Sequence, residues 1–204
     1  MNYDKIIATA AQEMRASGIR KFFDIAAEMK DCISLGVGEP DFKTPWAVRD
    51  AGIRNLEMGQ TRYTSNSGMK ELRTEICKYL DRRFGLHYDP DSQVLVTVGG
   101  SEAIDIGIRA LVNPGDGGII PEPCYVCYDP ITHLTGGKVV SIPLQEKNQF
   151  RLTAEELKAA ITPRTKMLIL PFPCNPTGAV MEKEDLEAIA EVLCGTDIMV
   201  LIGG

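Results

Sequence analysis

The sequence has few of the residues that most often mark metal, hydrolase or nucleic-acid chemistry. Its 204 residues include 2 histidines, His87 and His133, which are not spaced as ligands of one metal ion or as part of a serine-histidine-acid set. No run of lysine and arginine occurs, and the formal net charge is −6. A metal centre, a serine hydrolase and a nucleic-acid or acidic-membrane partner are therefore all disfavoured.

The sequence also lacks the apolar segments that membranes and secretion require. No apolar run approaches the roughly 18 residues of a membrane-spanning helix. The first residues, 1–6, show no basic segment followed by an apolar one, so we expect no signal peptide. The 6 cysteines are scattered, and a chain of this length does not need disulfides to fold. We expect reduced thiols and a cytoplasmic protein.

Short apolar runs alternate with amphipathic segments through the second half of the sequence. One of the intervening helices should begin at a capping box of Thr153 and Glu156, and another should span residues 183–193. This alternation predicts a three-layer α/β/α fold with a mainly parallel sheet. We expect its strands over residues 93–98, 118–120, 138–142, 166–170 and 198–202.

The first half of the sequence is typical of helices joined by polar loops. We expect helices over residues 3–16, from a Thr44 cap to about residue 56, and from a Ser67 cap to Gly85. Residues 33–38 have a strand-like apolar pattern interrupted by glycines. The last of the three helices should bury an apolar stripe, because its apolar residues recur at four-residue steps. That stripe consists of Leu72, Ile76, Leu80 and Phe84.

The chain is organised around residues 171–178, which follow the apolar run 166–170. Three prolines within six residues force the chain out of the sheet, because proline cannot donate to a strand ladder. In open α/β sheets, ligands bind at the point where strands end. Asn175 stands there with an amide that both donates and accepts. An ordinary asparagine-proline turn remains the alternative.

The turn at residues 99–102 is the best local candidate for an anion site. Two glycines followed by Ser101 let the chain curl tightly, so that the first N–H groups of the next helix and a hydroxyl point outward. The alternative is that Ser101 only caps the helix. The pattern is neither a P-loop nor a dinucleotide fingerprint.

Residues 124–127 leave two further alternatives open. Tyr125 follows a predicted strand end, where it either stacks on a planar ligand or belongs to the core. Cys124 and Cys127 have the spacing of a redox pair or half a zinc site, but the sequence has no second pair of this kind.

The order of these motifs along the chain resembles the class I/II aminotransferases of the fold type I pyridoxal-phosphate enzymes. The matching motifs run through essentially the whole chain. They are Leu35-Gly-Val-Gly-Glu-Pro-Asp-Phe42, Arg62-Tyr63-Thr64 followed by Gly68, Val98-Gly-Gly-Ser-Glu-Ala103, Pro121-Glu-Pro-Cys-Tyr125 and Asn175-Pro-Thr-Gly178. The resemblance implies amino-group transfer between an amino acid and a 2-oxo acid, with pyridoxal 5'-phosphate as cofactor.

The resemblance also implies roles for individual residues. Gly100, Ser101 and Glu102 match the turn that holds the cofactor phosphate. Tyr125 matches the aromatic residue that stacks on the pyridine ring, and Asn175 matches the amide that bonds the phenolic oxygen of the ring.

Two further matches concern the substrate and a second subunit. Tyr63 matches a tyrosine that reaches the phosphate in the partner subunit of a homodimer, and Gly38 matches a position beside the substrate. In the family the peptide bonds before Pro123 and Pro176 are typically cis, and we expect the same here.

The sequence departs from the family at its end. Residues 202–204 read Ile-Gly-Gly where the family has an aspartate that pairs with the pyridine nitrogen. No residue matches the lysine that carries the cofactor, so no catalytic residue is assigned. We expect an N-terminal portion, with an arm and small-domain segment over residues 1–44 and part of the large cofactor-binding domain over residues 45–204, ending before the last strands of the sheet. Such a portion is expected to be inactive by itself.

Three other functions stay open. The absent lysine favours a non-catalytic module that binds pyridoxal phosphate or a protein partner. A C–S lyase of the same fold is compatible with the same motifs. An unrelated nucleotide-binding domain would need a fingerprint that the sequence does not contain.

Overall fold

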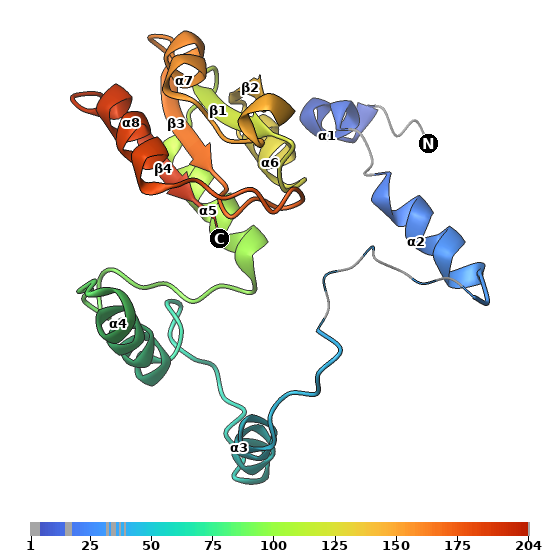
Figure 1. Cartoon of the computed structure of the whole chain (residues 1–204). Helices are drawn as coiled ribbons and strands as arrows, with labels where there is room; N and C mark the ends of the chain where they lie inside the picture. The colour runs from blue at the N-terminus through green and yellow to red at the C-terminus, as the bar shows by residue number, and fades with distance from the viewer. Residues whose placement is uncertain are drawn as a thin grey trace. The chain divides into compact units, whose positions relative to one another are not determined.

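The computed structural model describes residues 5–14, 18–31, 33, 36, 38 and 40–203, which form two compact units. The first unit combines the N-terminal residues up to 16 with residues 98–204, and the second spans residues 17–97 (Figure 1). The functional division into residues 1–44 and 45–204 stays a prediction. Among the described residues, no helix combines the length and apolar character needed to cross a membrane.

A parallel sheet of four strands forms the centre of the first unit. Its order is β2-β1-β3-β4, and each neighbouring pair runs in the same direction. The carboxyl ends of all four strands therefore lie at one edge of the sheet. The strands are β1 (Gly117–Glu122), β2 (Lys138–Pro143), β3 (Thr165–Leu170) and β4 (Met199–Ile202).

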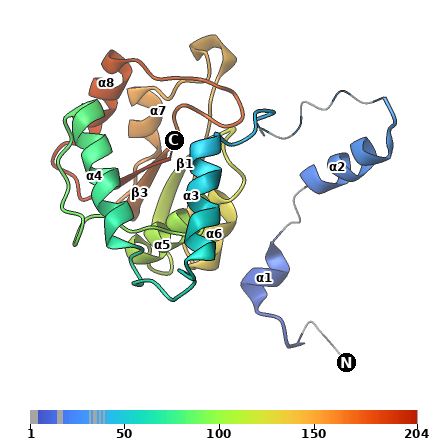
Figure 2. The ribbon, with the colours of Figure 1, turned by 90° about the horizontal axis from the view of Figure 1, so that it is seen from below.

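Helices cover both faces of this sheet (Figure 2). Leu168 and Leu170 of β3 pack with α7 and α8 on one face, whereas Met167 and Ile169 pack with α5 and α6 on the other. Successive side chains of a strand point to opposite faces, so a continuous apolar run serves two cores at once. The predicted three-layer α/β fold is confirmed. The described helices of this unit are α1 (Thr9–Glu13), α5 (Gly100–Leu111), α6 (Tyr128–Leu134), the 3-10 helix η2 (Glu146–Asn148), α7 (Ala154–Ala160) and α8 (Lys183–Leu193).

Two local features that the sequence predicts are present in the structure, a helix cap and a pair of cis peptide bonds. Thr153 Oγ1 accepts from the Glu156 N–H at 3.2 Å and the Glu156 carboxylate accepts from the Thr153 N–H at 3.0 Å, which confirms the capping box of α7. The peptide bonds before Pro123 and Pro176 are cis as predicted, and the bond between Phe172 and Pro173 is cis as well.

The strand predicted over residues 93–98 is wrong. These residues belong to none of the four strands of the described sheet, and Leu95 and Val98 are 50% and 94% exposed. An apolar pattern shows that a segment can enter a sheet, but a strand forms only where a neighbour takes up its backbone hydrogen bonds.

The second unit contains three described helices with little buried surface. They are α2 (Ile19–Glu28), α3 (Trp46–Glu57) and α4 (Lys70–Phe84), and α3 buries none of its residues. The predicted stripe on α4 is wrong at its ends, because Leu72 is 46% and Phe84 is 58% exposed. The buried residues of α4 are instead Arg73 and Cys77. The Arg73 guanidinium donates to Pro90 O and so faces the loop that follows the helix.

The predicted caps in this unit have mixed outcomes. Gly85 ends α4 in the left-handed conformation at φ 68°, as predicted. Thr44 and Ser67 do not cap, because Pro45 and Met69 occupy the cap positions of α3 and α4 without a side-chain bond. In the N-terminal segment, α1 is shorter than the predicted helix. Much of the strand-like pattern over residues 33–38 lies outside the described residues.

Candidate functional site

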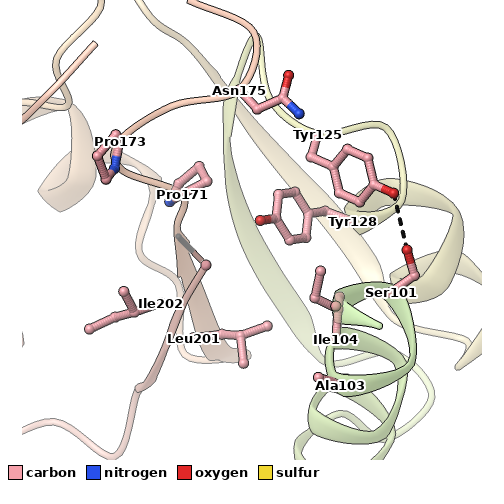
Figure 3. A pocket seen from close by; sticks show the side chains of 12 residues that line it. Ser101, Ala103, Ile104, Tyr125, Tyr128, Pro171, Pro173, Asn175, Leu201 and Ile202 are labelled. Atoms are coloured by element: carbon pink, nitrogen blue, oxygen red, sulfur yellow. Dashed lines mark hydrogen bonds between the residues drawn. The ribbon is translucent and has the colours of Figure 1, made fainter. Parts of the chain in front are cut away.

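A cavity of about 510 Å³ opens at the carboxyl edge of the sheet in the first unit (Figure 3). Its walls come from the start of α5, from the segments that follow β1 and β3, and from the end of β4. None of the described residues lining it carries a charge, so its polar groups are hydroxyls, an amide and backbone groups. The residues that line the cavity are Gly100, Ser101, Ala103, Ile104, Tyr125, Tyr128, Pro171, Pro173, Asn175, Leu201, Ile202 and Gly203.

The first turn of α5 provides the hydrogen-bond donors of this cavity. Gly99 precedes the helix at φ 90°, a conformation that favours glycine, and no side chain caps the helix. The first N–H groups of a helix have no partner within it, and the helix dipole adds positive potential at that end. A side chain at Gly100 would meet no atom within 4 Å, so the space beside this turn is open. This turn suits an anion such as a phosphate.

Ser101 and Tyr125 form a hydroxyl pair across the cavity. Their oxygens lie 3.1 Å apart, and either hydroxyl can donate (Figure 3). The Tyr125 ring meets the Tyr128 ring edge to face, with the centroids 6.0 Å apart. Tyr125 is 37% exposed and lines the cavity, so part of its side chain is accessible to a flat ligand there.

Asn175 stands at the tip of a tight turn after β3. Cys174 N–H donates to Ala179 O at 2.8 Å, and Gly178 N–H donates to Cys174 O at 2.7 Å. These two bonds close the turn around residues 175–177, so the Asn175 amide is presented at the cavity by a fixed backbone (Figure 3). The amide can donate to an oxygen of a bound ring.

Burial keeps the neighbouring thiols and phenol protonated near neutral pH. It raises the pKa of Tyr128 to about 12. Burial, with the nearby Glu122 carboxylate, raises the pKa of Cys124 to about 12. Burial also raises the pKa of Cys127, although a hydrogen bond with Ser101 works in the opposite direction. Thiols in this state are poor nucleophiles and poor metal ligands. Across the residues that the structure describes, no group of three or more potential ligands is arranged to hold a metal ion.

The structure brings together four of the predicted site residues, Gly100, Ser101, Tyr125 and Asn175. Glu102 lies in the same helical turn but is not among the residues that line the cavity, and its carboxylate turns back to accept from the Val98 N–H.

The other two predicted residues belong to the second unit. Tyr63 is fully exposed there and lines a separate cavity, and a side chain at Gly38 would meet no atom within 4 Å. The roles predicted for Tyr63 and Gly38 stay predictions.

Sequence reasoning missed Tyr128 as a site residue. It is 4% exposed and lines the cavity below Tyr125 (Figure 3). Its position three residues after Tyr125 was a usable signal, because the turn that leads into α6 brings the two rings into edge-to-face contact. Leu201 also escaped prediction, since an apolar residue in a strand does not reveal that it faces a cavity.

These features define a class of protein: an α/β protein with a cavity at the carboxyl edge of a parallel sheet, where a helix N-terminus and a tyrosine ring suit a flat anionic ligand. Residues 30–202 match the family described as aminotransferase class I and II. The chain belongs to the class I and II aminotransferase family.

Individual relatives agree with this assignment. YugH from Bacillus subtilis is 52% identical over 190 residues, which are 93% of this chain and 49% of the relative. Aspartate aminotransferase from Pyrococcus abyssi is 45% identical over 185 residues, covering 91% of this chain and 48% of that enzyme. The structure of a Thermus thermophilus aspartate aminotransferase mutant superposes with a TM-score of 0.89 at 36% identity, over 96% of this chain and 52% of that one. The chain thus spans about half the length of the relatives it matches.

Proposed function

We propose that this chain is the N-terminal portion of a pyridoxal-phosphate-dependent aminotransferase, which transfers an amino group between an amino acid and a 2-oxo acid. One observation carries the proposal: an uncapped helix start, an accessible tyrosine ring and an asparagine amide surround one cavity of about 510 Å³. The relatives named above as aspartate aminotransferases support the same reaction class.

The residues of the cavity suit each part of the cofactor. The first N–H groups of α5 and the Ser101 hydroxyl would hold the phosphate, and the Tyr125 ring would lie against the pyridine ring. The Asn175 amide would donate to the phenolic oxygen. Bound pyridoxal phosphate supplies an electron-withdrawing ring, which makes the Cα proton of an amino acid easier to remove.

The chain's own residues bind and orient in this proposal, and they do not transfer the proton. A transaminase needs a base for the Cα proton, and none of the described residues that line the cavity is a lysine. The lysine and the aspartate that the family uses would lie in the half of the relatives' length that this chain does not span. Residues 1–44 would form the arm and small-domain segment, and residues 45–204 would belong to the large domain.

A homodimer is part of the proposal. The fully exposed Tyr63 would reach the phosphate held by a partner subunit, and Gly38 would lie beside the substrate. We place the enzyme in the cytoplasm on the basis of its expected reduced cysteines. The substrate amino acid stays unassigned, because the cavity contains no charged residue among those described that would select a side chain.

The test is a titration of the chain with pyridoxal phosphate, followed by borohydride reduction and intact mass analysis. We expect saturable binding that inorganic phosphate weakens, since both compete for the start of α5. Absence of saturable binding would overturn the cofactor assignment.

A non-catalytic binding module is the second candidate, favoured by the absence of lysine from the described cavity wall. It predicts the same binding but no covalent adduct after reduction, even in the longest natural form of the protein. An adduct on one lysine of that longer form would support the aminotransferase. A C–S lyase would give the same adduct and would differ by releasing a thiol from a cysteine-type substrate.

A further inference from the structure

The two loops that carry Tyr125 and Asn175 are joined by a side chain. Cys174 Sγ donates a hydrogen bond to Pro123 O, with 3.2 Å between sulfur and oxygen. Cys174 belongs to the loop after β3, whereas Pro123 belongs to the loop after β1. The bond therefore links two segments that are 51 residues apart in the sequence.

Both ends of this bond lie close to a residue of the candidate site. Asn175 follows Cys174 directly, and Tyr125 stands two residues after Pro123. Cys174 is only 4% exposed, and its N–H and C=O are both bonded within the turn at 2.8 and 2.7 Å. A side chain held in this way has little freedom, so a displacement of one loop is transmitted to the other.

We infer that Cys174 is a positioning residue that fixes the spacing between the Tyr125 ring and the Asn175 amide. The inference rests on the proposed cofactor site, where one flat ligand must meet both groups at once. Loops without ladder bonds are the parts of a fold that open most easily, so a single bond between them matters for preorganisation. A thiol is a weak donor, which limits the expected effect.

Cys124 provides a matched comparison in the same region. Its Sγ donates to Tyr125 O at 3.7 Å, which is a bond to the next residue and stays within one loop. Cys174 is one of the groups that raise the pKa of Cys124, so the two thiols are neighbours. Truncating either one removes a thiol from the same surroundings. Only the loss of Cys174 removes a bond between the loops.

The experiment compares Cys174→Ala, Cys174→Ser and Cys124→Ala with the wild type by two readouts. The first is amide hydrogen exchange over residues 123–127 and 174–178 without ligand, and the second is the dissociation constant for pyridoxal phosphate. We expect Cys174→Ala to exchange faster in both loops and to bind the cofactor about three- to tenfold more weakly. Cys174→Ser keeps a donor and should stay within about twofold of the wild type, as should Cys124→Ala.

Two results would overturn the inference. One is a Cys174→Ala variant with wild-type exchange and affinity. The other is a Cys174→Ser variant as impaired as Cys174→Ala, because the sulfur would then act by packing and not by its hydrogen bond. If Cys174→Ala does not fold, Cys174→Val fills the space without a donor and takes its place. A wild type that fails to bind pyridoxal phosphate would overturn the proposed function, whereas the exchange readout would still decide the role of Cys174.

Discussion

Strand β3 and helix α3 show how differently the two units use apolar residues. Leu168 of β3 is completely buried against α7 and α8, whereas Leu56 of α3 is 68% exposed and Trp46 is 64% exposed. Apolar side chains stabilise a fold only in proportion to the surface they remove from water. The first unit therefore has a core that can hold a site in place, whereas the described residues of the second unit form helices without such a core.

The largest expected effect comes from shortening one leucine in each unit. Leu168→Ala leaves a cavity in the core and should lower the free energy of unfolding by about 2–5 kcal/mol. Leu56→Ala makes the same chemical change on an exposed helix and should cost less than about 0.5 kcal/mol. Urea unfolding of both variants measures the difference, and equal losses would contradict the contrast between the units.

Arg73 is one of the two buried residues of α4 in the second unit. Its guanidinium donates to Pro90 O and lies 3.9 Å from the Asp91 carboxylate, with 7% of the side chain exposed. We expect Arg73→Met to cost about 1–3 kcal/mol, because Pro90 O loses its donor. Hydrogen exchange over residues 86–93 should accelerate while the sheet stays protected.

The control for Arg73 is Arg54→Met, which breaks an exposed pair with Asp50 and should cost less than about 0.5 kcal/mol. An effect of Arg73→Met that spreads to the strands of the first unit would show that the two units unfold together.

A smaller effect is expected on ligand affinity when a hydroxyl is removed from the cavity. Ser101→Ala deletes a donor to the phosphate and should weaken pyridoxal phosphate binding about tenfold. Ser92→Ala removes a hydroxyl that bonds Asp89 in the second unit and should leave binding unchanged. Fluorescence titration measures both, and equal affinities would remove Ser101 from the site.

The last effect is confined to alkaline pH and concerns the pH dependence of stability. Burial raises the pKa of Tyr128 from 10.0 to about 12, so the native state holds this proton more tightly than the unfolded state. Stability must then fall as the pH rises between these two values. Tyr128→Phe lacks the titrating group and should gain in melting temperature relative to the wild type over that range. If the difference in melting temperature between Tyr128→Phe and the wild type stayed constant with pH, the raised pKa would be contradicted.

Prediction from sequence succeeded where local chemistry and burial agree. The helix at residues 183–193 and the capping box of α7 were predicted correctly, because their signals lie within a few neighbouring residues. Residues 93–98 were predicted wrongly as a strand, because pairing depends on a neighbour that a sequence pattern does not show. Thr44 failed as a cap because the chain enters α3 one residue later, at Pro45.

The candidate site shows the same division. The glycines before Ser101 and the prolines around Asn175 mark places where the backbone must turn, so Gly100, Ser101 and Asn175 were predictable from local pattern. Tyr125 was assigned to the site only through the family resemblance. The bond from Cys174 to Pro123 and the contact between the Ser101 and Tyr125 hydroxyls were not, because each joins distant segments. Sequence shows which residues can form a contact, and the topology of the sheet decides which of them meet.

Hydrogen exchange of the chain with and without pyridoxal phosphate tests the central claim most directly. We predict new protection at the start of α5, at residues 123–128 and at residues 174–178, because these segments surround one cavity. The helices α2 and α3 should show no change. Two results would contradict the claim that the carboxyl edge of this sheet is the cofactor site. One is protection confined to the second unit, and the other is no protection at any concentration of pyridoxal phosphate.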